Sequence, residues 1–355
     1  MGLQQWGAEV KERAPLRLAL RWAPGLALSL VAVVLLLRVV SLEHLAAAWQ
    51  RANGLYFLPG AALLLAAMIV RGFAWRVLAG GRIRPARAFW VLNVGYLVNA
   101  VLPVRLGDLA RAVLAGSPRE GDASTITASS ALSSVVLERV LDLVCILGLV
   151  LLALPVVARQ AWGGRTIVWT LATAGLGVVG VLAAGLVRRP PIRWLSMRTS
   201  PASRSARWVE RLESFLHGLE ALRDWRTALP AILLLAATWF IWLVEYTVLL
   251  RAFVPSATLG QGLVALVGSA LGMMVPSSPG GIGVYEAAVV GALGVIHIGQ
   301  EMALAYAISV HVLNSAGVIV LGLIGLAREG QTLERLMREV GRVSAGRQPD
   351  ATPPA

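Results

Sequence analysis

Charged side chains stand in three places within otherwise apolar sequence, and the first group is Arg105, Asp108 and Arg111. If this stretch is helical, Asp108 lies three residues from each arginine and can contact both. The group then keeps one net positive charge. Because a guanidinium offers a planar fork to phosphate oxygens, the group suits either a grip on a phosphate or a structural salt bridge.

Glu138, Arg139 and Asp142 form the second group, at the start of a long apolar run. On a helix the two carboxylates share a face, and Arg139 can reach Asp142. A charge at bilayer depth costs roughly 2.5–3.5 kcal/mol on insertion scales. We therefore expect these side chains to pair with one another or to line a wet cavity. A structural network between helices and a substrate or proton site both stay open.

The third group is the stretch Pro276-Ser-Ser-Pro-Gly-Gly-Ile-Gly-Val-Tyr-Glu286. Its prolines remove helix hydrogen bonds, and its glycines permit backbone angles that other residues avoid. We predict an unwound segment followed by a helix that starts near Gly283, whose free N–H groups suit an anion. Glu286 falls in the first turn, where it either offsets the helix dipole or belongs to a site. The candidate site residues of this stretch are Pro276, Ser277, Ser278, Gly280, Gly281, Gly283 and Glu286.

Four further polar residues interrupt apolar runs. His311 and Asn314 lie three residues apart in the last long run, and Glu245 stands in an earlier one. For these we expect hydrogen bonds between helices, and we count Asn314 as a candidate site residue. Arg71 lies near one end of its run, so we expect its side chain to extend to the membrane surface.

Long apolar runs must position all these groups. The chain is 57% hydrophobic and only 14% charged, whereas soluble domains are roughly one quarter charged. Several runs approach or exceed the 17–25 residues that a helix needs to cross a bilayer. The sequence therefore predicts an all-α, polytopic bundle of membrane helices.

The predicted bundle has about seven to eight spans plus broken or re-entrant pieces. In each half a shortened run ends at a proline, Pro103 or Pro276, and a glycine and a carboxylate follow. Interrupted runs at matching places favour an inverted repeat. The apolar segments are Trp22–Val40, Tyr56–Ala79, Phe89–Leu102, Val135–Val157, Thr166–Val187, Leu229–Leu250, Leu259–Val275, Val284–Ile298 and Met302–Leu326.

Arginine supplies nearly all of the net charge of +13, and Lys11 is the only lysine. The arginines lie between apolar runs, as in membrane proteins that keep positive loops in the cytoplasm. We therefore expect the cytoplasmic membrane as location, both termini in the cytoplasm, and no binding to nucleic acid. The predicted parts are a cytoplasmic tail (1–21), a first membrane half (22–187), a basic cytoplasmic loop with an amphipathic helix (188–228), a second membrane half (229–327) and a cytoplasmic tail (328–355).

Few residues could hold a metal. Cys145 is the only cysteine, and the four histidines are scattered. This excludes an intramolecular disulfide and a thiolate zinc site. A magnesium ion held by carboxylates stays open, but we expect no cofactor and no metal centre.

Three stretches, Asn99–Arg111, Leu137–Asp142 and Pro276–Glu286, together resemble the flippase-like membrane domain family, which includes the transmembrane region of lysylphosphatidylglycerol synthases. The resemblance covers about residues 20–330. This sequence departs from the family in having Asp108 where Glu is more frequent, and Val310-His311 where relatives often have Tyr-Arg. The larger synthases carry a soluble transferase domain after the membrane part. This chain ends at Ala355, so we expect no lysyl-lipid synthesis by this chain alone.

The resemblance implies movement of lipids or lipid-linked molecules across the cytoplasmic membrane, and a transporter more than an enzyme. In this hypothesis arginines and helix ends hold an anionic or phosphate-bearing headgroup, while the carboxylates orient it or bind coupling protons. One alternative is a membrane-embedded transferase acting on a polyprenyl phosphate. Others are a non-catalytic accessory of an envelope enzyme and a carrier of small solutes or ions. The expected partners are membrane lipids, and a protein partner or a homo-oligomer stays open.

Overall fold

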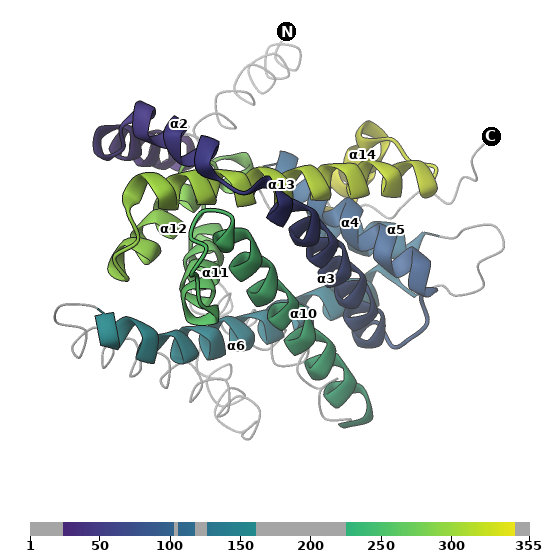
Figure 1. Cartoon of the computed structure of the whole chain (residues 1–355). Helices are drawn as coiled ribbons and strands as arrows, with labels where there is room; N and C mark the ends of the chain where they lie inside the picture. The colour runs from purple at the N-terminus through teal and green to yellow at the C-terminus, as the bar shows by residue number, and fades with distance from the viewer. Residues whose placement is uncertain (1–23, 103–105, 118–125, 161–224, 345–355) are drawn as a thin grey trace, which may run out of the picture.

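A computed structural model of the chain describes residues 24–102, 106–117, 126–160 and 225–344 (Figure 1). Every regular element in these residues is a helix, which agrees with the predicted all-α class. After the helix Pro24–Val39 the elements are α2 (Leu42–Arg51), η1 (Gly54–Tyr56), α3 (Phe57–Leu78), α4 (Pro85–Val101), α5 (Gly107–Gly116), α6 (Ala128–Gln160), α10 (Trp225–Arg251), α11 (Leu259–Met274), η3 (Pro279–Gly281), α12 (Val284–Val295), α13 (Gln300–Arg328) and α14 (Leu333–Ser344).

Four helices of the described residues are long and apolar enough to cross a membrane. A fifth span is present if helix Pro24–Val39 and α2, which meet at an angle of 84°, count as one bent element. The expected count of seven to eight is not confirmed, and the predicted span Thr166–Val187 lies outside the described residues. The four long spans are Gly54–Leu78, Ala128–Arg159, Trp225–Arg251 and Gln300–Arg328.

Two short helix pairs confirm the predicted interruptions. In the first half α4 ends at Val101 and α5 packs back against it. In the second half α11 ends at Met274, and α12 starts at Val284 and packs against α11. The two breaks lie close to each other: a Cβ atom built at Gly280 would lie 3.8 Å from the carbonyl oxygen of Ala100, near the end of α4. The inverted repeat itself stays a prediction.

The long helices hold these pairs between them. Helix α10 packs along α3, and α13 packs against α4 and α12, as Figure 1 shows. The described part of helix α10 starts at Trp225, so the helix includes the turn before the predicted start at Leu229. The arginine-rich part of the predicted basic loop, with its amphipathic helix, lies outside the described residues.

Helix α14, the last of the described helices, is amphipathic. Leu336 and Val340 are buried against the bundle, and α14 contacts α5. Its outer face carries two ion pairs one helical turn apart, Arg335–Glu339 and Arg338–Glu334, both at 3.7 Å. This part of the predicted C-terminal tail is therefore a helix docked on the bundle.

Candidate functional site

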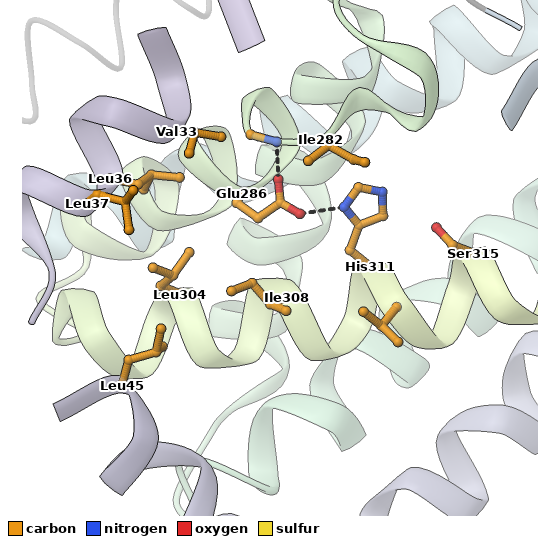
Figure 2. A pocket seen from close by; sticks show the side chains of 12 residues that line it. Val33, Leu36, Leu37, Leu45, Ile282, Glu286, Leu304, Ile308, His311 and Ser315 are labelled. Carbon is orange, nitrogen blue, oxygen red and sulfur yellow. Dashed lines mark hydrogen bonds and ion pairs between the residues drawn. The ribbon is translucent and has the colours of Figure 1, made fainter. Parts of the chain in front are cut away.

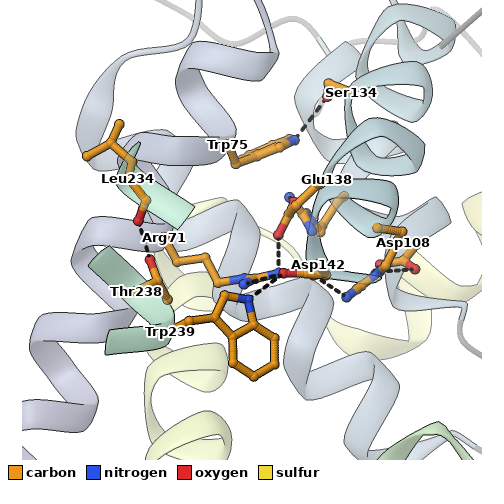
Figure 3. Close-up of polar contacts among 11 residues, drawn as sticks. Arg71, Trp75, Asp108, Ser134, Glu138, Asp142, Leu234, Thr238 and Trp239 are labelled. Carbon is orange, nitrogen blue, oxygen red and sulfur yellow. Dashed lines mark hydrogen bonds and ion pairs between the residues drawn. The ribbon is translucent and has the colours of Figure 1, made fainter. Parts of the chain in front are cut away.

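A buried ionic network joins α3, α5 and α6 (Figure 3). At its centre Glu138 pairs with two guanidinium groups: Arg71 Nη2 lies 2.7 Å from Oε1 as an ion pair, and Arg111 Nη2 donates a hydrogen bond to Oε2 at 2.6 Å. All three residues are at most 1% exposed. Glu138 thus connects three helices through one carboxylate.

Asp142, one turn further along α6, extends the network. It accepts hydrogen bonds from both terminal nitrogens of Arg71, and the indole Nε1 of Trp239 on α10 donates to its Oδ1 at 3.2 Å. Arg139 lies 3.5 Å from Asp142 and donates to Asp108 on α5 at 2.7 Å. This confirms the expected contact between Arg139 and Asp142.

Among the described residues the network is electrically balanced, because its arginines Arg71, Arg111 and Arg139 match its carboxylates Asp108, Glu138 and Asp142. Two of its arginines stack on tryptophan rings. The guanidinium of Arg111 lies 4.4 Å from the ring centre of Trp75, and that of Arg71 lies 5.3 Å from the ring centre of Trp242. Contact between opposite charges offsets part of the desolvation cost that each charge would pay alone in a bilayer.

One expectation for this region is wrong, and one contact that the spacing allowed is not made. Arg71 does not extend to the membrane surface but is buried against Glu138 and Asp142. Asp108 and Arg111 do not pair with each other, because each finds an opposite charge on α6 across the helix interface. Arg105 lies outside the described residues.

One signal in the sequence points to the role of Arg71. Glu138, Arg139 and Asp142 carry one net negative charge, so a buried network needs a further cation. Because an unpaired charge is costly at bilayer depth, an arginine inside an apolar run also implies a partner. The sequence leaves open which arginine meets which carboxylate.

The segment between α11 and α12 is not α-helical, as predicted, and contains only the short 3-10 helix η3. Gly280, Gly281 and Gly283 have positive φ angles of 71°, 76° and 86°, which side chains other than glycine rarely adopt. The segment is tied to helix Pro24–Val39, where the Ser29 hydroxyl accepts from the Ser278 N–H at 3.0 Å. Pro276 is exposed, and the carbonyl of Ser277 lies against Gly25, where a Cβ atom would be only 2.9 Å away.

Glu286 joins this segment to α13. Its Oε2 accepts from the Gly283 N–H at 2.6 Å, so it caps its own helix. Its Oε1 lies 2.5 Å from Nδ1 of His311, and the other ring nitrogen of His311 lies 2.9 Å from the carbonyl oxygen of Gly280. The expected hydrogen bond between helices is thus confirmed for His311, which was not among the candidate site residues.

A cavity of about 430 Å³ opens beside this pair. Glu286, His311 and Ser315 are its polar side chains, and the remaining walls are apolar (Figure 2). A groove of about 420 Å³ continues along α13 and shares Ile308 and Val312 with the cavity. The apolar walls come from Val33, Leu36 and Leu37 of helix Pro24–Val39, Leu45 of α2, Ile282 of the unwound segment, and Leu304, Ile308 and Val312 of α13.

Helix α10 contacts both the network and Tyr285, which lies next to the Glu286–His311 pair. Trp239 bonds to Asp142, and seven residues later the Tyr246 hydroxyl lies 3.1 Å from that of Tyr285, the neighbour of Glu286. Asn314 faces Tyr246, and its Oδ1 has no hydrogen-bond partner. The first two charged groups therefore merge into one network, whereas the third forms a separate site.

Glu245 is fully buried on α10, and both of its carboxylate oxygens lack a hydrogen-bond partner. This differs from the expected hydrogen bond between helices. A buried polar group without a partner costs about 1–3 kcal/mol. Glu245→Met should therefore raise the free energy of unfolding in detergent by about this amount. A decrease would show that Glu245 has a partner in solution, and Glu43→Met, at an exposed position, is the control.

In the described part of the chain, no set of three or more His, Cys, Asp or Glu side chains is placed to hold a metal ion. The long apolar helices and the buried ionic network define a multi-pass helical membrane protein.

Comparison with known proteins identifies its family. The family model described as lysylphosphatidylglycerol synthase TM region matches residues 22–322, and the chain belongs to this family. The chain is also similar to the glycosyltransferase AglD of Haloferax volcanii, with 25% identity over 373 residues. That match covers 95% of this chain but only 59% of the relative. No solved structure matches the chain.

Proposed function

We propose that the protein translocates an anionic or phosphate-bearing lipid, or a lipid-linked molecule, across the cytoplasmic membrane. The cavity beside Glu286 and His311 carries the proposal. It combines a few polar side chains at one place with apolar walls, and an apolar groove continues from it along α13. An amphiphile has the same division between headgroup and chain.

The surroundings of the cavity support access from the bilayer. Val312, which lines both the cavity and the groove, is 61% exposed, and Ile282 at the cavity is 60% exposed. Apolar side chains this exposed in a membrane protein are suited to contact lipid. In this proposal the headgroup enters the polar part of the cavity and the chains stay in the groove.

The ionic network has a different role in the proposal. Its three arginines are engaged with carboxylates, so they hold α3, α5 and α6 together and do not grip the headgroup. The family's description names a phospholipid synthase, which favours a phosphate-bearing lipid as substrate.

Liposome scrambling tests the proposal. Purified protein is reconstituted with fluorescent phosphatidylglycerol, phosphatidylcholine or a polyprenyl phosphate, and a reductant added outside bleaches the accessible lipid. We expect bleaching well beyond the outer-leaflet half. Ile308→Trp should fill the cavity and the groove and slow bleaching about tenfold, which corresponds to ~1.4 kcal/mol.

The matched control is Ile319→Trp, at an exposed position on α13 that lines neither the cavity nor the groove. It should bleach as the unmodified protein does. Equal rates in both tryptophan variants would contradict the role of the cavity. Bleaching limited to the outer half with every lipid would contradict translocation.

The name of the Haloferax volcanii relative, a glycosyltransferase, favours a transferase as the second candidate, and we keep a polyprenyl phosphate as its proposed substrate. This chain spans 59% of that relative, so the activity is a proposal here. Glycolipid formation by purified protein from a polyprenyl phosphate and a sugar donor would favour it over translocation.

A further inference from the structure

His311 lies between two groups that accept hydrogen bonds. Its Nε2 is 2.9 Å from the carbonyl oxygen of Gly280, and its Nδ1 is 2.5 Å from a carboxylate oxygen of Glu286. A carbonyl oxygen can only accept, so Nε2 carries a hydrogen. Both contacts can be hydrogen bonds only if a further proton sits between Nδ1 and Glu286.

This proton has two equivalent descriptions. It resides on Nδ1, which makes an imidazolium beside a carboxylate, or on Glu286, which makes a neutral acid beside a neutral ring. In both cases the pair holds one proton more than a neutral histidine beside an ionised glutamate. In both cases its net charge is zero, which suits a site with largely apolar walls.

Within the described part of the chain, the helices around the pair offer few other charges to it. Tyr285 packs on His311 with ring centres 4.4 Å apart, and Tyr246 of α10 contacts Tyr285. Helix α11 has no ionisable side chain, and Tyr96 of α4 interacts with the charges of the ionic network. On helix Pro24–Val39 and α2, the ionisable residues are exposed. Loss of the proton therefore leaves an uncompensated negative charge beside the cavity.

We propose that the Glu286–His311 pair is a proton-binding site that fastens the unwound segment 276–283 to α13, and that the segment is released when the proton leaves. The fastening contact is the bond from His311 to the carbonyl of Gly280. Without the proton, the ring of His311 cannot keep both hydrogen bonds in this arrangement. The Nδ1 lone pair then repels the ionised carboxylate of Glu286, which favours an open, hydrated site. The proton passes to water, and only an N–H or O–H bond breaks.

This inference rests on the proposed translocation where it concerns transport. Ile282 and Gly283 of the released segment form part of the cavity wall, so release of the segment changes the cavity. The proton site then couples the cycle of lipid movement to pH or to a proton gradient.

Hydrogen–deuterium exchange tests the proton site without any assay of transport. Backbone amides of 276–286 are followed at acidic and alkaline pH, after correction for the intrinsic pH dependence of exchange. The segment should be protected at acidic pH and exchange roughly five- to tenfold faster at alkaline pH, as the loss of one hydrogen bond predicts. His311→Ala should exchange fast at both pH values.

Glu286→Gln is the decisive variant. Its amide can donate to Nδ1 and accept from the Gly283 N–H, so every hydrogen bond persists without a titrating proton. The segment should then be protected at both pH values. His44→Gln, at an exposed histidine of α2, should respond to pH as the unmodified protein does. A pH response in Glu286→Gln equal to that of the unmodified protein, or no response in the latter, would overturn the proton site.

A second measurement follows lipid bleaching and internal pH together in liposomes under a proton gradient. We expect the gradient to change the bleaching rate of the unmodified protein but not that of Glu286→Gln. Bleaching that ignores the gradient, together with a pH response in exchange, would overturn the coupling and keep the proton site. If no bleaching occurs at any pH while exchange still responds to pH, translocation is overturned and the proton site is kept.

Discussion

Replacing Glu138 by alanine is expected to lower the free energy of unfolding by about 3–5 kcal/mol, the cost of breaking a buried ion pair from one side. The variant leaves Arg71 and Arg111 buried without their shared carboxylate. Arg71 keeps its contact with Asp142, so Arg111 loses more. Unfolding of the purified protein in detergent, by heat or by a denaturing surfactant, measures the effect.

A surface glutamate is the matched control. Glu334 on α14 forms an exposed ion pair with Arg338 at 3.7 Å, and such pairs contribute about 0–1 kcal/mol. Glu334→Ala should therefore unfold almost as the unmodified protein does. Adding Arg111→Met to Glu138→Ala should restore part of the lost stability, because the unpaired cation is removed. Equal stability of Glu138→Ala and Glu334→Ala would contradict a buried network.

Gly107→Ala is expected to have the second large effect, a loss of about 3 kcal/mol at the upper end of the cost of overpacking. A Cβ atom at Gly107 would lie 1.9 Å from the carbonyl oxygen of Gly95 on α4, so the two backbones must separate. The Gly107 N–H also donates to Oδ1 of Asn99 at 2.8 Å, and this bond would be strained. Because α5 carries Asp108 and Arg111, its displacement also disturbs the ionic network.

Gly148 on α6 provides the comparison, because nothing lies within 4 Å of a Cβ atom built there. Gly148→Ala should raise stability by about 0.5–1 kcal/mol, since alanine is the better helix former. The two variants should therefore differ in sign when they unfold in the same detergent. A Gly107→Ala protein as stable as Gly148→Ala would show that α4 and α5 do not approach as closely as described.

Variants of residues that hold the helices together are expected to differ from variants at the cavity. The ionic network and the α4–α5 contact hold helices together, and their variants should lose stability. The Glu286–His311 pair faces a cavity, and Glu286→Gln should keep its hydrogen bonds and its stability. Loss of function without loss of stability is thus expected only at the cavity.

Much of the fold follows from local properties of the sequence. The break between α11 and α12 was predicted from two prolines and three glycines, and the structure has positive φ angles at those glycines. The early end of α4 was predicted from Pro103 in the same way. Each of these features depends on residues a few positions apart, so the sequence carries it directly.

The partners of the charged side chains could not be predicted in this way. Helical spacing allowed Asp108 to contact Arg111, yet each pairs with a residue of α6. Arg71 was expected at the membrane surface, yet it lies with Glu138, 67 positions later in the chain. His311 meets Glu286 across two helices. Local spacing favours pairs on one helix, whereas burial favours pairs that close the gap between helices.

By itself, the sequence determined that this is a helical membrane protein, where its helices break, and which charges need partners. The cost of placing a charge or an open backbone group in lipid belongs to that group wherever its helix lies, so composition and spacing reveal it. Only the tertiary structure decided which charges meet, which of them face a cavity, and that His311 belongs to the site. Those choices depend on how each helix is rotated and how closely neighbouring backbones approach, and side chains far apart in the chain fix both.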